Sequence, residues 1–111
     1  EYGDVSPINK NVAEPGMIFS IEPGIYIEGS HGVRLENELL VCEGEKNEYG
    51  EFLYFEPITY VPFDLDAINP DIMNAEDKER LNTYHATVYE KVSPYLNDEE
   101  KEWLKKYTRA I

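Results

Sequence analysis

The chain of 111 residues is poor in several features that would assign it to a common class of protein. It has a single cysteine, Cys42, which cannot form an internal disulfide and so fits a reducing compartment such as the cytoplasm. Only 10 basic residues accompany 23 acidic ones, so the formal net charge is −13. Because a negative field repels phosphates, this balance argues against nucleic acid and against anionic membrane surfaces as partners.

Long apolar runs are also missing. No stretch approaches the length of a membrane span, and no domain-sized repeat is present. The sequence begins with Glu1 rather than methionine and passes directly into a segment with prolines and asparagines at Pro7, Asn9 and Pro15. We therefore interpret it as a piece of a longer protein.

The order of the predicted elements indicates an α+β fold, with antiparallel strands first and two helices after them. We expect residues 1–63 to carry the strands and residues 64–111 to form a helical extension of the same domain. In the last strand, Pro57 and Pro62 favour an edge strand or an irregular extended segment over a central strand. The strands are predicted at 17–21, 25–27, 33–42 and 52–63, with a turn at 28–32 and a polar loop at 44–50.

Both helices carry recognisable start signals. Asn74 is the expected cap of the first helix, which Ser93-Pro94 should end, and Asn97 with Glu100 predicts a capping box for the second. His85 lies on the apolar stripe of the first helix and is interpreted as a packing residue rather than a ligand. The second helix is expected to bury Trp103, Leu104, Tyr107 and Ile111.

Two glutamates stand out from the other acids. Glu22 and Glu36 each close a short apolar run, and a glycine-containing turn separates the runs. Pairing of the runs would bring both carboxylates to one side of an antiparallel pair, and hard divalent cations bind such clustered oxygens. Arg34 shares a strand face with Glu36 but also with Glu38, so spacing alone leaves open which of the two glutamates is a ligand.

The motifs around these glutamates resemble one family. Residues 14–26 (EPGMIFSIEPGIY) are similar to the strand and Glu-Pro-Gly motif of the pita-bread metallopeptidases, and residues 32–37 (GVRLEN) to their later Gly-Ile-Arg-Ile-Glu segment. The tail, with FEPITYVPF at 55–63 and LNTYH at 81–85, resembles the C-terminal extension of three-domain aminopeptidases P. The chain thus looks like the C-terminal part of the catalytic domain of an Xaa-Pro aminopeptidase, with a pita-bread fold.

The resemblance implies roles for individual residues. Glu22 would be a terminal ligand of one metal ion and the general base, and Glu36 would bridge two ions. Arg34 would hold the carboxylates in place from outside the ligand set. His31 and Tyr26 would contact substrate, the alternatives being a solvated turn residue for His31 and core packing for Tyr26.

The implied enzyme would use two divalent ions, foremost Mn²⁺ with Zn²⁺ or Co²⁺ as alternatives, to generate a nucleophile at neutral pH. It would hydrolyse the N-terminal Xaa-Pro bond of peptides, as a cytoplasmic homodimer. The chain itself lacks the two aspartates and one histidine that complete the family's site, so we expect the isolated chain to be inactive. The alternatives are a prolidase, which the tail disfavours, and a catalytically dead pita-bread binding or scaffold module.

Overall fold

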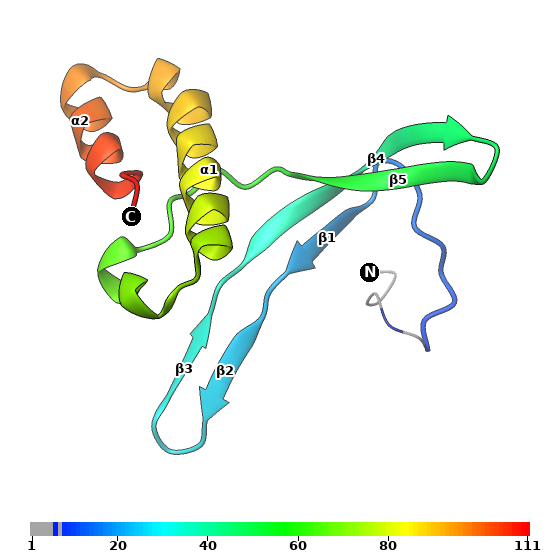
Figure 1. The fold of residues 1–111 in the computed structure, drawn as a ribbon, viewed down its shortest axis with the longest axis horizontal. Helices are drawn as coiled ribbons and strands as arrows, with labels where there is room; N and C mark the ends of the chain where they lie inside the picture. Colours follow the sequence, from blue (N-terminus) through cyan, green and yellow to red (C-terminus); the bar gives the residue numbers. More distant parts are fainter. Residues whose placement is uncertain (1–5, 7) are drawn as a thin grey trace. The chain divides into compact units, whose positions relative to one another are not determined.

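The computed structural model describes residue 6 and residues 8–111, and over this range five strands precede the helices. This order confirms the expected α+β class. The chain divides into two compact units, one ending at Thr59 and the other spanning Tyr60–Ile111 (Figure 1).

The first unit is built from antiparallel strands. A three-stranded sheet has the order β1-β4-β5, and a separate two-stranded ladder joins β2 to β3. β5 is an edge strand that ends at Pro57, and the predicted strand 52–63 continues past it as an irregular extended segment that contains Pro62. The strands are β1 (Ile18–Ile21), β2 (Gly24–Ile27), β3 (His31–Arg34), β4 (Asn37–Asn47) and β5 (Gly50–Pro57).

The two ladders form one long hairpin with a single register. The β1–β4 ladder ends with the pair Ile21–Asn37, and the β2–β3 ladder begins with the pair Gly24–Arg34, so the two residues between them on each side continue the same pairing. Between the ladders, the Leu35 N–H donates a backbone hydrogen bond of 3.2 Å to the Pro23 carbonyl. Proline has no N–H to donate in return, which explains why the ladder is interrupted without a change of register.

The predicted loop at 44–50 is wrong. β4 continues through most of this segment, and β5 begins at its last residue. A register shift lets the pairing persist, and Lys46 forms an ion pair with Glu51 across it. Gly44 permits the close approach of the strands, because a Cβ there would lie 2.8 Å from the Phe52 carbonyl oxygen.

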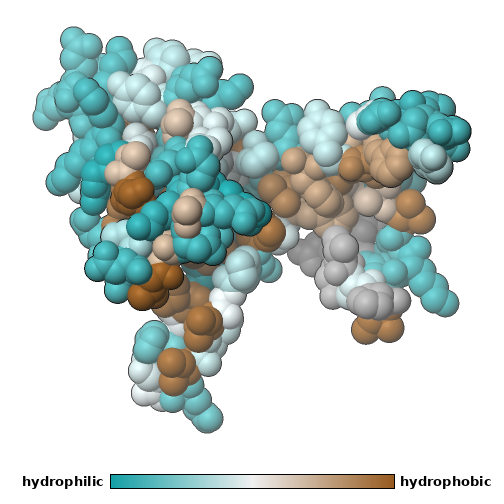
Figure 2. All heavy atoms as spheres, viewed as in Figure 1, coloured by the Kyte–Doolittle hydropathy of each residue, from teal (hydrophilic) through white to brown (hydrophobic). Residues whose placement is uncertain are grey.

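The sheet of the first unit leaves much apolar surface open. Val41 is its only buried apolar residue within the described range, and Phe19 meets Phe55 edge-on at 6.0 Å. Figure 2 shows hydrophobic residues along β4 and β5. Apolar surface of this extent is typical of faces that contact further protein. The exposed large side chains of the sheet include Ile18, Ile21, Phe52, Leu53, Tyr54 and Phe55.

The second unit consists of two α-helices with short 3₁₀ turns around them. The Asn74 side chain accepts a hydrogen bond from the Asp77 N–H, and Asn97 and Glu100 form the reciprocal capping box, so both predicted start signals are confirmed. The elements are η1 (Leu65–Ala67), η2 (Pro70–Ile72), α1 (Ala75–Val92), η3 (Ser93–Tyr95) and α2 (Asp98–Tyr107). In the part of the chain that the structure describes, neither helix has the length and apolar character needed to cross a membrane.

The core of the second unit contains His85, Val88, Leu65 and Leu104, all buried. The expected burial of Trp103 is wrong, because its side chain is 57% exposed. Successive residues of a helix point about 100° apart, so burial of Leu104 turns the preceding position towards the helix surface. There the Trp103 ring lies 4.6 Å from that of Tyr107.

Candidate metal-binding site

Glu22 and Glu36 lie opposite each other where the hairpin ladder is interrupted. The shared register of the two ladders pairs these positions, although neither residue belongs to a strand. Directly opposed residues of an antiparallel pair have Cβ atoms about 4.5–5.5 Å apart. The side chains remain 49% and 37% exposed, so the carboxylates are open to a ligand.

Arg34 contacts both carboxylates. Its Nη2 lies 3.1 Å from Glu36 Oε2, and its Nε lies 3.9 Å from Glu22 Oε2. The charge of Glu36, a hydrogen bond with Tyr26 and the charge of Glu22 raise the pKa of Arg34 above its usual value. Exposed ion pairs contribute little to stability, so the consequence of this arrangement is orientation: one guanidinium holds two carboxylates that would otherwise repel each other.

Tyr26 reaches Arg34 across a pair of glycines. A Cβ on Gly32 would lie 2.6 Å from Tyr26 Cδ1, and a Cβ on Gly24 would lie 2.6 Å from the Tyr26 hydroxyl. The ring therefore lies along the ladder in space that only glycine leaves open. The sequence analysis does not predict this role of the glycines, although the pattern carries a signal: Gly24 precedes Tyr26 by one strand period, and Gly32 is its direct partner.

His31 does not join the carboxylates. It is the first residue of β3, at the turn, where its Nδ1 lies 2.8 Å from Ser30 Oγ. It lies five positions before Glu36 in the sequence, which corresponds to roughly 16 Å of extended chain. A substrate contact by His31 stays a prediction.

The oxygen donors of Glu22 and Glu36 fit a hard divalent cation, but they are only part of a site. Such ions take six or more ligands in typical protein sites, and a structural Zn²⁺ takes four. Among residue 6 and residues 8–111 there is no group of three or more histidine, cysteine, aspartate or glutamate side chains that could hold a metal ion. Glu22 and Glu36 by themselves therefore do not make up a complete site of this kind.

The second histidine has no link to a site of this kind. His85 is fully buried in the second unit, and its Nε2 accepts a hydrogen bond of 3.0 Å from the Phe63 N–H. Burial, with a further effect from the charge of Arg109, lowers the pKa of His85. A neutral, buried, hydrogen-bonded imidazole agrees with its interpretation as a packing residue.

Two family models match successive parts of the chain. Residues 1–43 match metallopeptidase family M24, and residues 51–111 match the C-terminal region of peptidase_M24. The two matches together leave only the tip of the β4–β5 hairpin unassigned.

Individual relatives agree with these matches. The chain is 40% identical over 100 residues to Xaa-Pro aminopeptidase 2 of Homo sapiens, covering 86% of this chain and 15% of the relative. It is 38% identical over 109 residues to aminopeptidase P1 of Arabidopsis thaliana, covering 95% and 17%. The chain thus spans about a sixth of the length of these curated relatives.

A solved structure shares the fold. The X-prolyl aminopeptidase of Caenorhabditis elegans, described as a cytosolic enzyme with a di-nuclear active site, superposes with a TM-score of 0.74 at 28% identity. The match covers 89% of this chain and 17% of that one. The strands and helices described above therefore have the arrangement of the last part of a pita-bread fold.

Proposed function

Because this chain belongs to metallopeptidase family M24, we propose that it forms the last part of the catalytic domain of a dinuclear-metal aminopeptidase. The substrate would be a peptide with proline in the second position, and the product its free first residue. The observation that carries the proposal is the opposition of Glu22 and Glu36 across one hairpin, with Arg34 in contact with both. Relatives named Xaa-Pro aminopeptidase support the substrate class.

In this proposal the three side chains have distinct tasks. Glu36 would be shared between the two metal ions, and Glu22 would help to hold one of them. Two divalent ions, which we propose to be Mn²⁺, would activate water and polarise the scissile carbonyl. Glu22 would also serve as the general base that accepts a proton from water, and the contact of its Oε2 with Arg34 would orient it for that role. Arg34 fixes the orientation of both carboxylates before substrate arrives.

The rival functions receive less support. A scaffold module without catalysis has no chemical need for two opposed carboxylates with a shared guanidinium. A prolidase would use the same two glutamates, but the match of residues 51–111 and the names of the relatives favour an aminopeptidase. The single Cys42 and the cytosolic description of the C. elegans enzyme support our proposal that the protein acts in the cytoplasm, and we retain the homodimer as part of it.

The test is an assay of the full-length protein that contains this chain. With Mn²⁺ present, a short peptide with proline at position two should lose its first residue, and the same peptide with alanine at that position should not. The chain alone should release nothing, and its titration with Mn²⁺ should show only weak binding, because two ligands do not complete a site. Cleavage of Xaa-Pro dipeptides but not of longer peptides would support the prolidase, and tight stoichiometric binding by the chain alone would contradict the two-ligand account.

Replacing the Tyr26 hydroxyl tests whether this residue orients Arg34 or binds substrate. We expect Tyr26→Phe to lower metal affinity or kcat of the full-length enzyme by about tenfold, the usual effect of losing a hydrogen bond just outside the ligands. The measurements are Mn²⁺ affinity and steady-state kinetics. Tyr49→Phe is the matched control, since Tyr49 is an exposed turn residue, and it should behave as the wild type. A rise in KM alone, with metal affinity unchanged, would instead make Tyr26 a substrate contact.

A further inference from the structure

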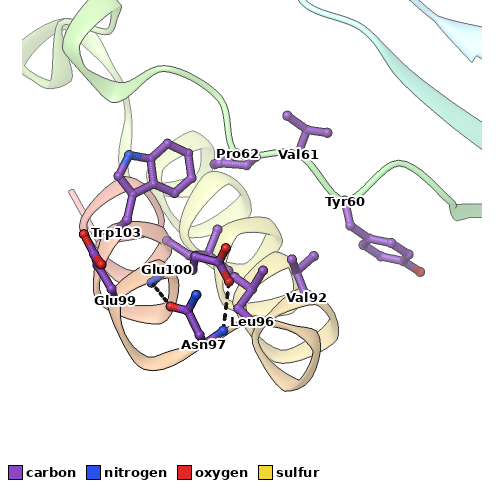
Figure 3. Close-up of a pocket in the computed structure, with 10 residues that line it drawn as sticks. Tyr60, Val61, Pro62, Val92, Leu96, Asn97, Glu99, Glu100 and Trp103 are labelled. Atoms are coloured by element: carbon purple, nitrogen blue, oxygen red, sulfur yellow. Dashed lines mark hydrogen bonds between the residues drawn. The ribbon is translucent and has the colours of Figure 1, made fainter.

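A groove in the second unit is independent of the carboxylates. It lies between the extended segment 60–62, the end of α1 and the start of α2, with a volume of about 650 Å³ (Figure 3). Binding pockets in proteins typically measure about 300–1,000 Å³, so the groove is large enough for a short peptide segment. It is lined by Tyr60, Val61, Pro62, Val92, Leu96, Asn97, Glu99, Glu100, Trp103 and Leu104.

The groove combines exposed apolar surface with charge of one sign. Val61 is 63% exposed and Trp103 57% exposed, so two large apolar side chains are available to a partner. The charged residues that line the groove, Glu99 and Glu100, are both acidic. The Glu100 carboxylate accepts a hydrogen bond of 2.8 Å from the Asn97 N–H, which ties it to the helix cap and leaves Glu99 as the main acidic group towards a ligand.

We propose that this groove binds a peptide segment in which a large apolar side chain is flanked by lysine or arginine. The apolar side chain would lie against Val61 and Leu96, where its burial provides the affinity. The flanking cation would pair with Glu99 and lie over the face of Trp103, the aromatic ring that attracts cations most strongly. Apolar anchors beside a charged rim are a common arrangement in protein interfaces.

Charge favours a basic partner over a second copy of this chain. With 23 acidic and 10 basic residues, another copy would present mostly like charge to an acidic groove. Within the second unit, residues 60–111, acidic residues also outnumber basic ones. The groove lies wholly in that unit, whereas Glu22 and Glu36 lie in the first, so the inference does not depend on the proposed peptidase activity.

The experiment uses the full-length protein and two fluorescent peptides with acetylated N-termini, which an aminopeptidase cannot cleave. One peptide has the sequence Lys-Leu-Phe-Lys, and in the other both lysines are replaced by glutamate. Fluorescence anisotropy should show binding of the lysine peptide and much weaker binding of the glutamate peptide. Trp103→Ala should lower the affinity for the lysine peptide by about tenfold or more, as loss of a central aromatic anchor does.

Two charge reversals on α2 test whether Glu99 contributes to binding through its position in the groove. Glu99→Lys should lower the affinity for the lysine peptide by several-fold and raise the affinity for the glutamate peptide. Glu102→Lys makes the same change of net charge at an exposed position outside the groove and should leave both affinities within about twofold, as expected for a screened surface charge. Both positions are exposed, so the variants should fold, and release of the first residue from an Xaa-Pro peptide should be unchanged.

Several results would overturn the inference. One is absence of binding by the wild type, which would mean that other parts of the protein cover the groove. Another is an equal effect of Glu99→Lys and Glu102→Lys, which would reduce the interaction to general charge attraction. A third is conversion of a dimer to a monomer by Trp103→Ala, measured by light scattering, which would assign the groove to a second copy.

Discussion

Glu36→Gln is expected to abolish release of the first residue from an Xaa-Pro peptide by the full-length enzyme. Glutamine keeps the size of the side chain but loses its negative charge, and a neutral amide cannot bridge two cations as a carboxylate does. Losing several kcal/mol of transition-state stabilisation corresponds to a fall in kcat on the order of a thousandfold or more. Bound Mn²⁺, measured by atomic emission after dialysis, should fall together with activity.

The neighbouring glutamate provides the control. Glu38→Gln makes the same chemical change on β4, where Glu38 pairs with Ser20 away from the interruption. We expect it to retain activity within a few-fold, because a surface charge two residues from the site acts only through screened electrostatics. If Glu36→Gln keeps near-normal activity and Glu38→Gln loses it, Glu38 rather than Glu36 would be the metal ligand. Glu22→Gln should lose activity as Glu36→Gln does, since the proposal makes it both ligand and base.

His85→Ala is expected to destabilise the second unit by about 2–4 kcal/mol, the combined effect of a cavity and an unpaired buried N–H. His85 is fully buried beside the rings of Phe63 and Tyr84, and its Nε2 accepts the Phe63 N–H. Hydrogen exchange of the Phe63 amide in the full-length protein measures this directly. The amide should exchange at least about thirtyfold faster in the variant, the rate ratio that corresponds to 2 kcal/mol.

The same imidazole makes stability depend on pH. Its pKa is lowered in the folded state because burial disfavours the charged form, and the charge of Arg109 adds to this. The unfolded chain therefore takes up the proton first, so the contribution of His85 is complete above about pH 6.5 and is lost as pH falls towards the lowered value. The Phe63 amide should lose protection over this window, because the open state takes up a proton on His85 more readily than the folded state does, so the free energy of opening falls as pH decreases.

Two variants separate this effect from general acid sensitivity. His85→Gln retains a side-chain acceptor without a titratable group, so it should keep part of the protection and lose the pH dependence between 6.5 and lower values. His31→Ala removes the other histidine, which is exposed at the turn, and should leave the profile unchanged. A wild-type profile in His85→Gln would assign the pH dependence to carboxylates instead.

Local signals predicted this fold better than cross-strand ones. The caps at Asn74 and Asn97 were predictable because their partners lie three residues away in the sequence. The polar composition of segment 44–50 predicts a loop, whereas its actual strand pairing depends on a register shift and on Gly44, neither of which local composition reveals. Helical spacing predicts that Trp103 and Leu104 are both in the core. Only Leu104 is buried, and which of these adjacent residues is covered depends on what α2 packs against.

The candidate site also contains both features that the sequence predicts and features that depend on strand pairing. Glu22, Glu36 and Arg34 were identified through motif resemblance, with spacing alone leaving Glu38 as an alternative. Antiparallel pairing of the two runs was also expected, but the contact of Arg34 with Glu22 and the space that Gly24 and Gly32 leave for Tyr26 depend on the exact register, which spacing alone does not give. The groove in the second unit depends on contact between segment 60–62 and residues 92–104, which are distant in sequence, so no local pattern could predict it.

The interruption at Pro23 also bears on how related sequences can vary in length. Register, rather than the number of intervening residues, sets Glu22 opposite Glu36. Insertions or deletions confined to the turn at Glu28–Ser30 would therefore preserve the pair, whereas one residue added to a single arm would move every later side chain to the other face. Searches for distant relatives should let the number of residues between the two glutamates vary and require strand pairing on both sides of the proline.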